Sequence, residues 1–471
     1  MKSVQSMTYY ELRREAARLV PRMLQLTRMK GNTDMVREKG RKKGYSQFDL
    51  KQKEFVKQER LLDKDEIHSF VEVSCRAAAC PMPLNLDVWD GLWCPFGCKY
   101  CFANAFRSSL YTAFFDNSKS LGFRHCNPDT SRRELDKLMK FRRTDPQATT
   151  GDVRRAIAME IPLRLGIRFE DFMPIEKEKG VSLAMLNYLA DIDYPVMINT
   201  KSALVAEDAY LTALSRNRGR AAVHVTLISS DDAILKKLEP QAPSYAERLE
   251  TIRRLSAAGV RTVARIEPFL VMVNDDPDRV EEYIENLQKA GCSHITLDTY
   301  SYSAYNQGIS QAFYNEGFDF ERLFLLGCDS QPLGSLLLDR FMDLFRSRGF
   351  SCSTFDVGCS ATNNQTICCE VGDWFKGGWN WGSIVAASRF VIQRGGKPTR
   401  WVDFHSAVMK RGGFLSDALE REVHQLWNQE GNEAYHIGWA TGLNAIGYDG
   451  DIVWTYNKGS DFRQDTVGAC L

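Results

Sequence analysis

Three cysteines stand close together in one short segment, at Cys94, Cys98 and Cys101. The surrounding residues 93–102 read WCPFGCKYCF. Three thiolates separated by three and then two residues can converge on one face of an iron–sulfur cubane, which leaves one iron open to a reactant. Gly97 allows a tight turn around such a cluster, and Pro95 restricts the backbone beside the first ligand. The alternatives are a zinc site, which ordinarily needs a fourth protein ligand, and inert buried cysteines.

The composition limits the classes of protein to which such a site could belong. The chain has 471 residues, 44% of them apolar, which allows about two to four compact units and excludes a disordered chain or a small disulfide scaffold. No run approaches the roughly 18 apolar residues of a membrane span, and the start lacks the apolar core of a secretory signal. We therefore expect a cytoplasmic protein without a membrane contact. Its 13 cysteines, an odd number, then serve as thiols or metal ligands rather than disulfides.

Charge is distributed unevenly along the chain. Residues 1–60 contain 16 Lys and Arg against 7 Asp and Glu, although the whole chain carries a formal charge of +1. Apolar residues recur at helical spacing from Leu12 to Leu24, and a basic stretch runs from Arg37 to Lys43. We interpret residues 1–65 as a basic helical N-terminal extension. Its basic stretch is either a solvated linker or a nucleic-acid contact.

From about residue 66 to 300, short β-branched runs alternate with helical patterns, which is typical of a parallel sheet built from β/α units. The clearest helix is Ser244–Ala258, with Ser244 as its N-cap; Ser182–Ala190 and Asp276–Ala290 are similar. Six such units predict an open or partial barrel, in which ligands gather at the carboxyl ends of the strands. We predict the strands near Leu84–Val88, Pro162–Phe169, Pro195–Asn199, Ala222–Ile228, Thr262–Pro268 and His294–Asp298.

The composition changes after about residue 345, where seven of the nine tryptophans lie. We therefore predict a barrel over residues 66–345 and a separate Cys/Trp-rich subdomain over residues 346–471. Four cysteines of this subdomain could hold an auxiliary iron–sulfur cluster or zinc, or could be buried or redox-active thiols, because adjacent cysteines point opposite ways in an extended chain. They are Cys352, Cys359, Cys368 and Cys369.

The cysteine loop resembles the Cys-x3-Cys-x2-Cys loop of the radical S-adenosylmethionine (SAM) superfamily. Further motifs occur over roughly residues 85–300. They are Pro174-Ile175-Glu176, Thr200-Lys201-Ser202, Glu239-Pro240 with Pro243, Arg248 and Leu255 to Gly259, and more weakly Cys368-Cys369. In these motifs the chain more closely resembles the spore photoproduct lyase-like branch, also called DNA repair photolyases. The resemblance implies an α/β fold with a partial (β/α)6 TIM-like barrel of the radical SAM type. It also implies a 4Fe-4S cluster that cleaves SAM reductively to a 5′-deoxyadenosyl radical, which abstracts hydrogen from the substrate.

The resemblance also implies roles for individual residues. Cys94, Cys98 and Cys101 would be the cluster ligands, and eight residues would bind SAM. Tyr100 and Phe102 would pack near the adenine or be plain packing. Lys201 would reach polar groups of SAM or lie on the surface. Arg265 and Glu267, on the fifth strand, would line the barrel mouth or form a mutual ion pair. The eight are Tyr100, Phe102, Glu170 (where relatives often carry Asp), Lys201, Thr226, Ser229, Arg265 and Glu267.

One residue of the related lyase is missing from this chain. Spore photoproduct lyase uses a cysteine near its second strand as a hydrogen-atom donor, and Pro162–Asp171 contains none. Repair of a thymine dimer by that route is therefore disfavoured. The candidates for another donor are Cys352, Cys359, Cys368, Cys369 and Tyr300.

The substrate is argued from basic and aromatic residues. The N-terminal extension, a cluster from Arg132 to Arg143 and the tryptophans Trp374, Trp379 and Trp381 favour nucleic acid, whereas the neutral overall charge does not. We expect a lyase, isomerase or base-modifying enzyme acting on a thymine-like or modified base in DNA or a nucleotide. The alternatives are radical modification of a peptide or small metabolite, and a nucleic-acid-binding protein with a structural iron–sulfur or zinc site. The implied partners are a low-potential electron donor of the flavodoxin or ferredoxin type, and DNA.

Overall fold

The computed structural model describes the two ends of the chain only in part and its middle almost completely. The predicted site residues Phe102, Tyr300, Cys359, Cys368 and Cys369 lie outside the described residues. The described ranges are 7–18, 66–68, 72–75, 84–90, 94–101, 124–167, 169–299, 316–318, 332–354, 370–371, 374, 382–411, 413–428 and 443–456.

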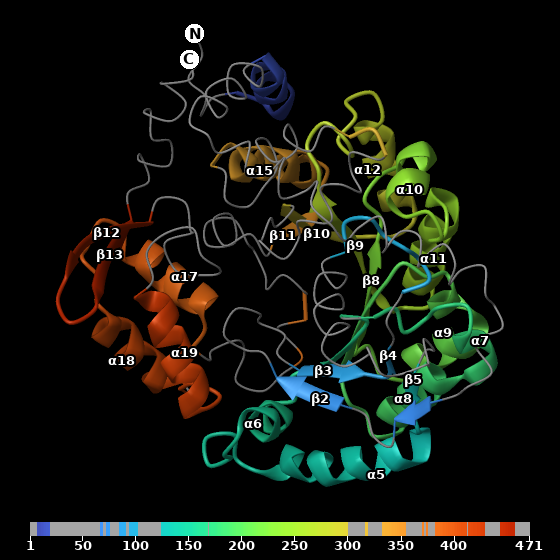
Figure 1. Cartoon of the computed structure of the whole chain (residues 1–471), viewed down its shortest axis with the longest axis horizontal. Helices are drawn as coiled ribbons and strands as arrows, with labels where there is room; N and C mark the ends of the chain where they lie inside the picture. Colours follow the sequence, from blue (N-terminus) through green and yellow to red (C-terminus); the bar gives the residue numbers. More distant parts are fainter. Residues whose placement is uncertain are drawn as a thin grey trace, which may run out of the picture.

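An eight-stranded sheet forms the centre of the structure, in the order β11-β10-β9-β8-β7-β6-β3-β2 (Figure 1). β2 is antiparallel to β3, and the other neighbours are parallel. Among the described residues β2 and β11 are the sheet's edges, so the barrel is open, as predicted. The strands are β2 (Glu72–Cys75), β3 (Leu84–Asp87), β6 (Leu163–Leu165), β7 (Val196–Thr200), β8 (Ala221–Thr226), β9 (Arg261–Phe269), β10 (His294–Thr299) and β11 (Ser351–Thr354).

The six predicted strands are present, with two differences in the sheet. β6 ends at Leu165, earlier than predicted, because Gly166 adopts a left-handed φ of +76° and passes so close to the next strand that a Cβ would meet the Asn199 carbonyl oxygen at 1.9 Å. The sheet also continues past residue 345, since β11 pairs with β10 in register, His294 opposite Ser351. We did not expect this strand.

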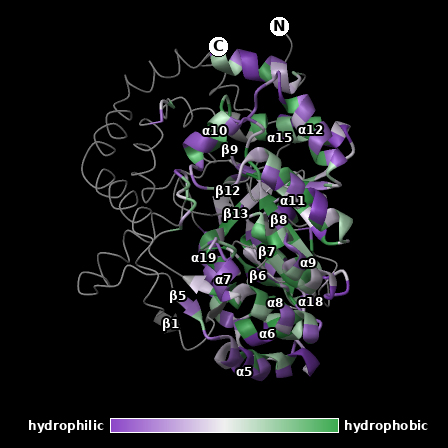
Figure 2. Cartoon of the chain, turned by 90° about the vertical axis from the view of Figure 1, so that its right-hand side faces the viewer, coloured by the Kyte–Doolittle hydropathy of each residue, from purple (hydrophilic) through white to green (hydrophobic). Residues whose placement is uncertain are grey.

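Helices connect the parallel strands and pack against one side of the sheet (Figure 1). α11 contacts β8 and β9, and α15 contacts β10 and β11. Figure 2 shows hydrophobic and hydrophilic residues alternating along these helices, as expected where one face is buried. They are α7 (Glu176–Lys179), α8 (Val181–Asp191), η4 (Leu204–Ala206), α9 (Asp208–Ser215), α10 (Asp232–Leu238), α11 (Tyr245–Ala257), α12 (Val280–Lys289) and α15 (Pro332–Ser347).

Two of the predicted helices illustrate how local signals set the boundaries. α11 begins after Ser244, whose hydroxyl and the Glu247 carboxylate form the predicted capping box. α12 begins at Val280, later than the predicted Asp276. The Asp276 side chain accepts the Asp278 amide at 3.0 Å, which holds the preceding residues in a turn.

The two faces of the sheet differ in polarity. Residues opposite each other in parallel strands point to the same face. One face carries Ile198, Val223 and Ala264 toward the helices. The other carries polar side chains across four strands, for example Thr226 of β8 opposite Arg265 of β9. This polar face is the inner surface of the open barrel.

The remaining elements flank the sheet. The N-terminal helix, residues 9–18, is anchored by Asp275, which accepts the Tyr9 hydroxyl and pairs with Arg13 at 2.8 Å. The C-terminal helices pack around aromatic side chains, with Phe404 stacked on Trp427 at 5.7 Å. The described residues contain no helix long and apolar enough to cross a bilayer. These elements are β1 (Glu66–His68), β4 (Trp89–Asp90), β5 (Arg124–Cys126), α5 (Pro128–Met139), η3 (Lys140–Arg143), α6 (Asp152–Ala158), α17 (Ile384–Arg394), α18 (Trp401–Arg411), α19 (Asp417–Trp427), β12 (Leu443–Tyr448) and β13 (Ile452–Tyr456).

Candidate metal and cofactor site

The cysteine loop, residues 94–101, follows β3 and β4 and consists of two consecutive turns. The Gly97 amide donates to the Cys94 carbonyl at 3.2 Å, and the Cys101 amide donates to the Cys98 carbonyl at 3.3 Å. Gly97 has a φ of +63°, a conformation that a residue with a Cβ rarely adopts. The predicted turn at Gly97 is therefore confirmed, and it brings the three cysteines into one compact loop.

The end of α10 holds this loop in place. The Lys99 amide donates to the Leu238 carbonyl at 2.8 Å, and the Gln241 amide donates to the Phe96 carbonyl at 3.3 Å. Leu238 is the last residue of α10, where helical carbonyls lack partners within the helix. The loop thus provides a hydrogen-bond donor for the Leu238 carbonyl at the end of α10, and the same bond holds the loop in place.

A buried side-chain network lies directly beneath the loop. The Tyr100 hydroxyl donates to the Glu239 carboxylate, and that carboxylate pairs with the Arg248 guanidinium at 2.5 Å. Arg248 also donates to the Thr226 carbonyl at 2.9 Å and the Pro243 carbonyl at 2.7 Å. Burial is the main cause that raises the pKa of Tyr100 well above its usual value, so its hydroxyl keeps the proton that it donates. The network joins the loop to the end of β8 and to α11.

Lys201, immediately after β7, places its ammonium group 5.4 Å from the centroid of the Tyr100 ring. Burial acts to lower the pKa of Lys201, but the Cys98 and Cys101 thiols and Glu239 act to raise it, and the net shift is upward. Burial raises the pKa of the Cys98 thiol, and Lys201 opposes that rise. The lysine is therefore charged and lies within electrostatic reach of two of the three cysteines.

Glu170, a predicted SAM contact, is engaged by the protein itself. Its carboxylate accepts the Thr200 hydroxyl at 2.6 Å and the backbone amides of Lys201 and Phe172, each at 3.1 Å. Burial raises the pKa of Glu170, and these hydrogen bonds oppose the rise. Its evident role in this structure is to fix the chain that carries Lys201.

Thr226, Arg265 and Glu267 lie on the polar face at adjoining positions. Thr226 is opposite Arg265, which forms an ion pair with Glu267 and lies 3.4 Å from the Asn199 amide oxygen. The Thr296 hydroxyl donates to Glu267 at 3.3 Å. The ion pair that the sequence left as an alternative is thus present, and its two side chains stay 24% and 14% exposed. Ser229 instead serves the turn before α10, where its hydroxyl accepts the Asp231 amide at 3.0 Å.

The donor set of the loop fits an iron–sulfur cluster. It offers three thiols, and no cysteine whose side chain is described forms a disulfide. Within the described ranges, no three His, Cys, Asp or Glu side chains are placed to hold a single metal ion, and the three cysteines of the loop are among the side chains to which this applies. Thiols release their protons when they bind iron, and the charge of Lys201 favours thiolates beside it.

The predicted second metal site lies mostly outside the described residues. Of its four cysteines the structure describes Cys352, a buried β11 residue whose thiol lies 3.7 Å from the Met342 carbonyl. Burial raises the pKa of Cys352 to about 12, as expected for a thiol packed between β11 and α15. The auxiliary site stays a prediction.

Sequence reasoning missed a second buried network, around Glu176. This fully buried carboxylate accepts the Trp89 indole N–H at 2.8 Å, the Tyr210 hydroxyl at 3.0 Å, and the amides of Val181 and Leu183. Two of these donors are the first-turn amides of α8, and Trp89 belongs to β4, which leads into the cysteine loop. Glu176 appeared in a family motif, but only the fold shows that it is a structural anchor.

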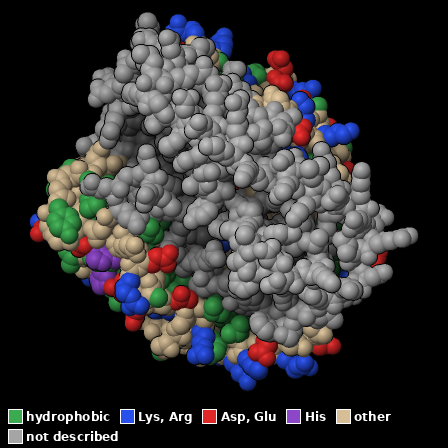
Figure 3. Space-filling view, viewed as in Figure 1, with side chains coloured by type: hydrophobic (Ala, Val, Ile, Leu, Met, Phe, Trp, Pro, Cys, Tyr) green, Lys and Arg blue, Asp and Glu red, His purple; other side chains and the backbone are tan. Residues whose placement is uncertain are grey.

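The features that favoured nucleic acid are partly used for packing. Arg142 pairs with Glu160 at 2.7 Å, and Trp374 is buried beneath Arg261, 4.6 Å from its ring centroid. Acidic and basic side chains alternate over α5 and α6, along the lower rim in Figure 3. Trp379 and Trp381 lie outside the described residues.

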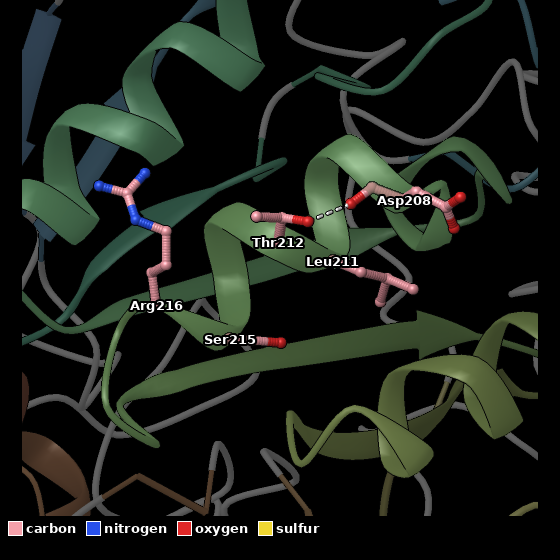
Figure 4. Close-up of a pocket in the computed structure, with 5 residues that line it drawn as sticks. All are labelled: Asp208, Leu211, Thr212, Ser215 and Arg216. Carbon is pink, nitrogen blue, oxygen red and sulfur yellow. Dashed lines mark hydrogen bonds between the residues drawn. The ribbon is translucent and has the colours of Figure 1, made fainter.

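A shallow surface depression lies away from the cysteine loop, on α9 (Figure 4). Its polar groups are already engaged: the Thr212 hydroxyl donates to the Asp208 carbonyl at 2.7 Å, and Arg216 pairs with Asp191. The Ser215 hydroxyl donates to the Ala258 carbonyl at 3.3 Å. The depression therefore presents no group of side chains suited to catalysis.

Comparison with known proteins gives limited similarity. No family model matches the chain. Over 235 residues, 49% of this chain, it is 23% identical to the uncharacterized proteins Rv2578c of Mycobacterium tuberculosis and Mb2609c of Mycobacterium bovis. The match spans 64% of the length of each relative, which is less than two thirds.

Two solved structures share parts of the arrangement. A variant of spore photoproduct lyase with bound AdoMet and dinucleoside spore photoproduct is similar over 61% of this chain and 81% of that chain, with 14% identity and a TM-score of 0.42. Streptococcus suis SuiB bound to S-adenosylmethionine is similar over 73% of this chain and 67% of that chain, with 11% identity and a TM-score of 0.38.

Proposed function

We propose that this chain is a radical SAM enzyme in which Cys94, Cys98 and Cys101 hold a 4Fe-4S cluster. The observation that carries the proposal is the single loop of three thiols with the charged Lys201 in electrostatic reach of two of them. When bound by these three cysteines, such a cluster would supply the electron for reductive cleavage of SAM, which yields a 5′-deoxyadenosyl radical able to take hydrogen from the substrate.

The chain's own residues would bind and orient the co-substrate. Lys201, whose ammonium group lies 5.4 Å from the centroid of the Tyr100 ring, would offer a positive charge to a carboxylate. Thr226, Arg265 and Glu267 present a hydroxyl, a guanidinium and a carboxylate on the inner face of the open barrel. Such a set suits the ribose hydroxyls and the amino-acid end of SAM.

We further propose a thymine-like or modified base, in DNA or a nucleotide, as the substrate. The support is the charge of residues 1–60, with 16 Lys and Arg against 7 Asp and Glu, together with the exposed Arg133, Lys137, Lys140 and Arg143 of α5 and η3. An electron donor of the flavodoxin or ferredoxin type would be the redox partner, because sulfonium cleavage consumes one electron.

Anaerobic reconstitution with iron and sulfide tests the enzyme directly. The protein should hold about four irons and, with a strong reductant, should convert SAM to 5′-deoxyadenosine. Cys98→Ala should lose both properties. The matched control is Cys292→Ala, a buried cysteine in the turn before β10 that should keep both. A fully assembled cluster that neither binds nor cleaves SAM would refute the proposal and favour a structural cluster.

Isotope transfer tests the substrate class. Deuterated thymidine oligonucleotides and deuterated peptides are offered separately, and deuterium in 5′-deoxyadenosine is measured by mass spectrometry. Transfer from the oligonucleotides is expected, because the radical takes its hydrogen from the substrate. Transfer from peptides alone would remove DNA as the substrate and leave radical SAM chemistry intact.

A further inference from the structure

The network beneath the cysteine loop unites residues that are far apart in the chain. Tyr100 belongs to the loop, Glu239 follows α10, and Arg248 lies in α11. The side chains of Glu239 and Arg248 are fully buried, at 0% exposure each. An ion pair with no solvent contact is costly to build, because both charges lose their hydration. The position of the Glu239–Arg248 ion pair beside the cysteine loop therefore indicates a function at the loop.

The geometry gives the pair two connections to the loop. One is mechanical: Tyr100 donates to Glu239, and on either side of Glu239 the residues Leu238 and Gln241 hydrogen bond to the loop backbone. The other is electrostatic, because the Glu239 carboxylate acts to raise the pKa of the Cys98 thiol, and Cys98 acts to raise the pKa of Arg248. The Arg248 guanidinium also reaches the Thr226 carbonyl at the end of β8, so the whole assembly is tied to the sheet.

We propose that Tyr100, Glu239 and Arg248 form a charge-balanced clamp that positions the cysteine loop and sets the reduction potential of the cluster it binds. This inference rests on the proposed function. The three are positioning residues: they act through the loop and through the local field, and none is required to touch the substrate.

The sign of each effect follows from charge balance. Reduction adds one negative charge to the cluster, so an uncompensated positive charge nearby raises the reduction potential and an uncompensated negative charge lowers it. With both residues charged, the effects of Glu239 and Arg248 on the reduction potential largely cancel. Removing one charge leaves the effect of the other uncompensated, whereas removing both leaves no net charge from the pair.

Potentiometric titration followed by electron paramagnetic resonance of the reconstituted protein measures this. Glu239→Gln keeps the side-chain shape and should shift the potential upward, since Arg248 is left uncompensated. Each single variant leaves one buried charge without its partner and costs stability: Arg248→Met leaves the carboxylate, and Glu239→Gln leaves the guanidinium, which still donates to the Thr226 and Pro243 carbonyls. Folding of both single variants is therefore checked by circular dichroism. The double variant Glu239→Gln with Arg248→Met avoids that problem and should return close to the wild-type potential.

The same helix offers a matched control. Glu250 and Arg253 of α11 form an ion pair at 2.6 Å with both side chains exposed. Glu250→Gln should leave the potential unchanged. A Glu239→Gln potential no different from that of Glu250→Gln, or a double variant shifted as far as Glu239→Gln, would overturn the electrostatic half of the proposal.

Tyr100→Phe tests the positioning half without changing any charge. Losing the hydroxyl removes one hydrogen bond from the clamp, so a chelator should strip iron from the cluster roughly two- to tenfold faster than from wild type. An unchanged stripping rate would refute the positioning role. If the wild-type protein assembles no cluster at all, the proposed function fails; if it assembles one and cleaves SAM while the variants behave as wild type, only the clamp fails.

Discussion

Replacing Glu176 by glutamine should destabilise the protein although the side chain keeps its size. The two carboxylate oxygens accept hydrogen bonds from four donors, two on each oxygen; three of these bonds are buried, and the one from the Leu183 amide is part-buried. A glutamine amide has only one oxygen, and its NH2 group cannot accept. If the oxygen faces Trp89 and Val181, the NH2 group faces Tyr210, whose hydroxyl can turn to accept, and Leu183, whose amide loses its only acceptor here.

The size of the effect follows from these contacts. An orphaned buried donor costs about 1–3 kcal/mol, and hydrogen bonds to a charged acceptor exceed those to a neutral one by roughly 1 kcal/mol. We therefore expect Glu176→Gln to reduce the free energy of unfolding by about 2–4 kcal/mol. At roughly 2–4 °C per kcal/mol for a domain of this size class, the melting temperature should fall by about 5–15 °C.

Thermal and urea unfolding followed by circular dichroism would measure this change. Glu178→Gln is the matched control, because Glu178 lies two residues away in α7 with an exposed side chain and should change stability by less than about 0.5 kcal/mol. Since Trp89 precedes the cysteine loop, Glu176→Gln should also hold less iron after reconstitution. Equal stability of the two variants would show that the four contacts do not anchor the fold.

Two further predictions concern stability. Burial lowers the pKa of His294 to about 3. The unfolded chain therefore binds a proton near the ordinary pKa of about 6.5, while the folded chain does not. The free energy of unfolding should fall by about 2 kcal/mol from pH 7 to pH 5 because of this group. Burial raises the pKa of Asp339 to about 6, which acts in the opposite direction, so the measured quantity is the difference in pH slope between wild type and His294→Gln; identical slopes would contradict the assignment. Gly166→Ala should destabilise by more than about 3 kcal/mol in urea titrations, because its Cβ would meet the Asn199 carbonyl oxygen at 1.9 Å, whereas Gly259→Ala, with a similar φ and nothing within 4 Å, should cost only about 1–2 kcal/mol. Equal losses would mean that φ rather than the close approach governs Gly166.

Short-range patterns accounted for most of the individual elements. The capping box at Ser244 and Glu247 marked the start of α11, and short apolar runs marked six strands, β3 and β6 to β10. We did not predict β11, with the sequence SCST, because it is short and not apolar throughout. It forms because its backbone pairs with β10. Helix caps and turns depend on residues a few positions apart, whereas the pairing of a strand depends on a partner strand that is distant in the chain.

The type and spacing of the three cysteines and the turn at Gly97 are local properties, so the sequence alone predicts the chemistry of the loop. The residues that surround the loop follow only from the packing of distant segments. Tyr100 and Glu239 are 139 residues apart, and no periodicity relates them. Arg265 and Glu267 were recognisable as a polar pair on one strand, but their contacts with Asn199 of β7 and Thr296 of β10 follow only from the fold. Buried charges must find partners wherever the fold brings them, so their partners follow from the packing of distant segments.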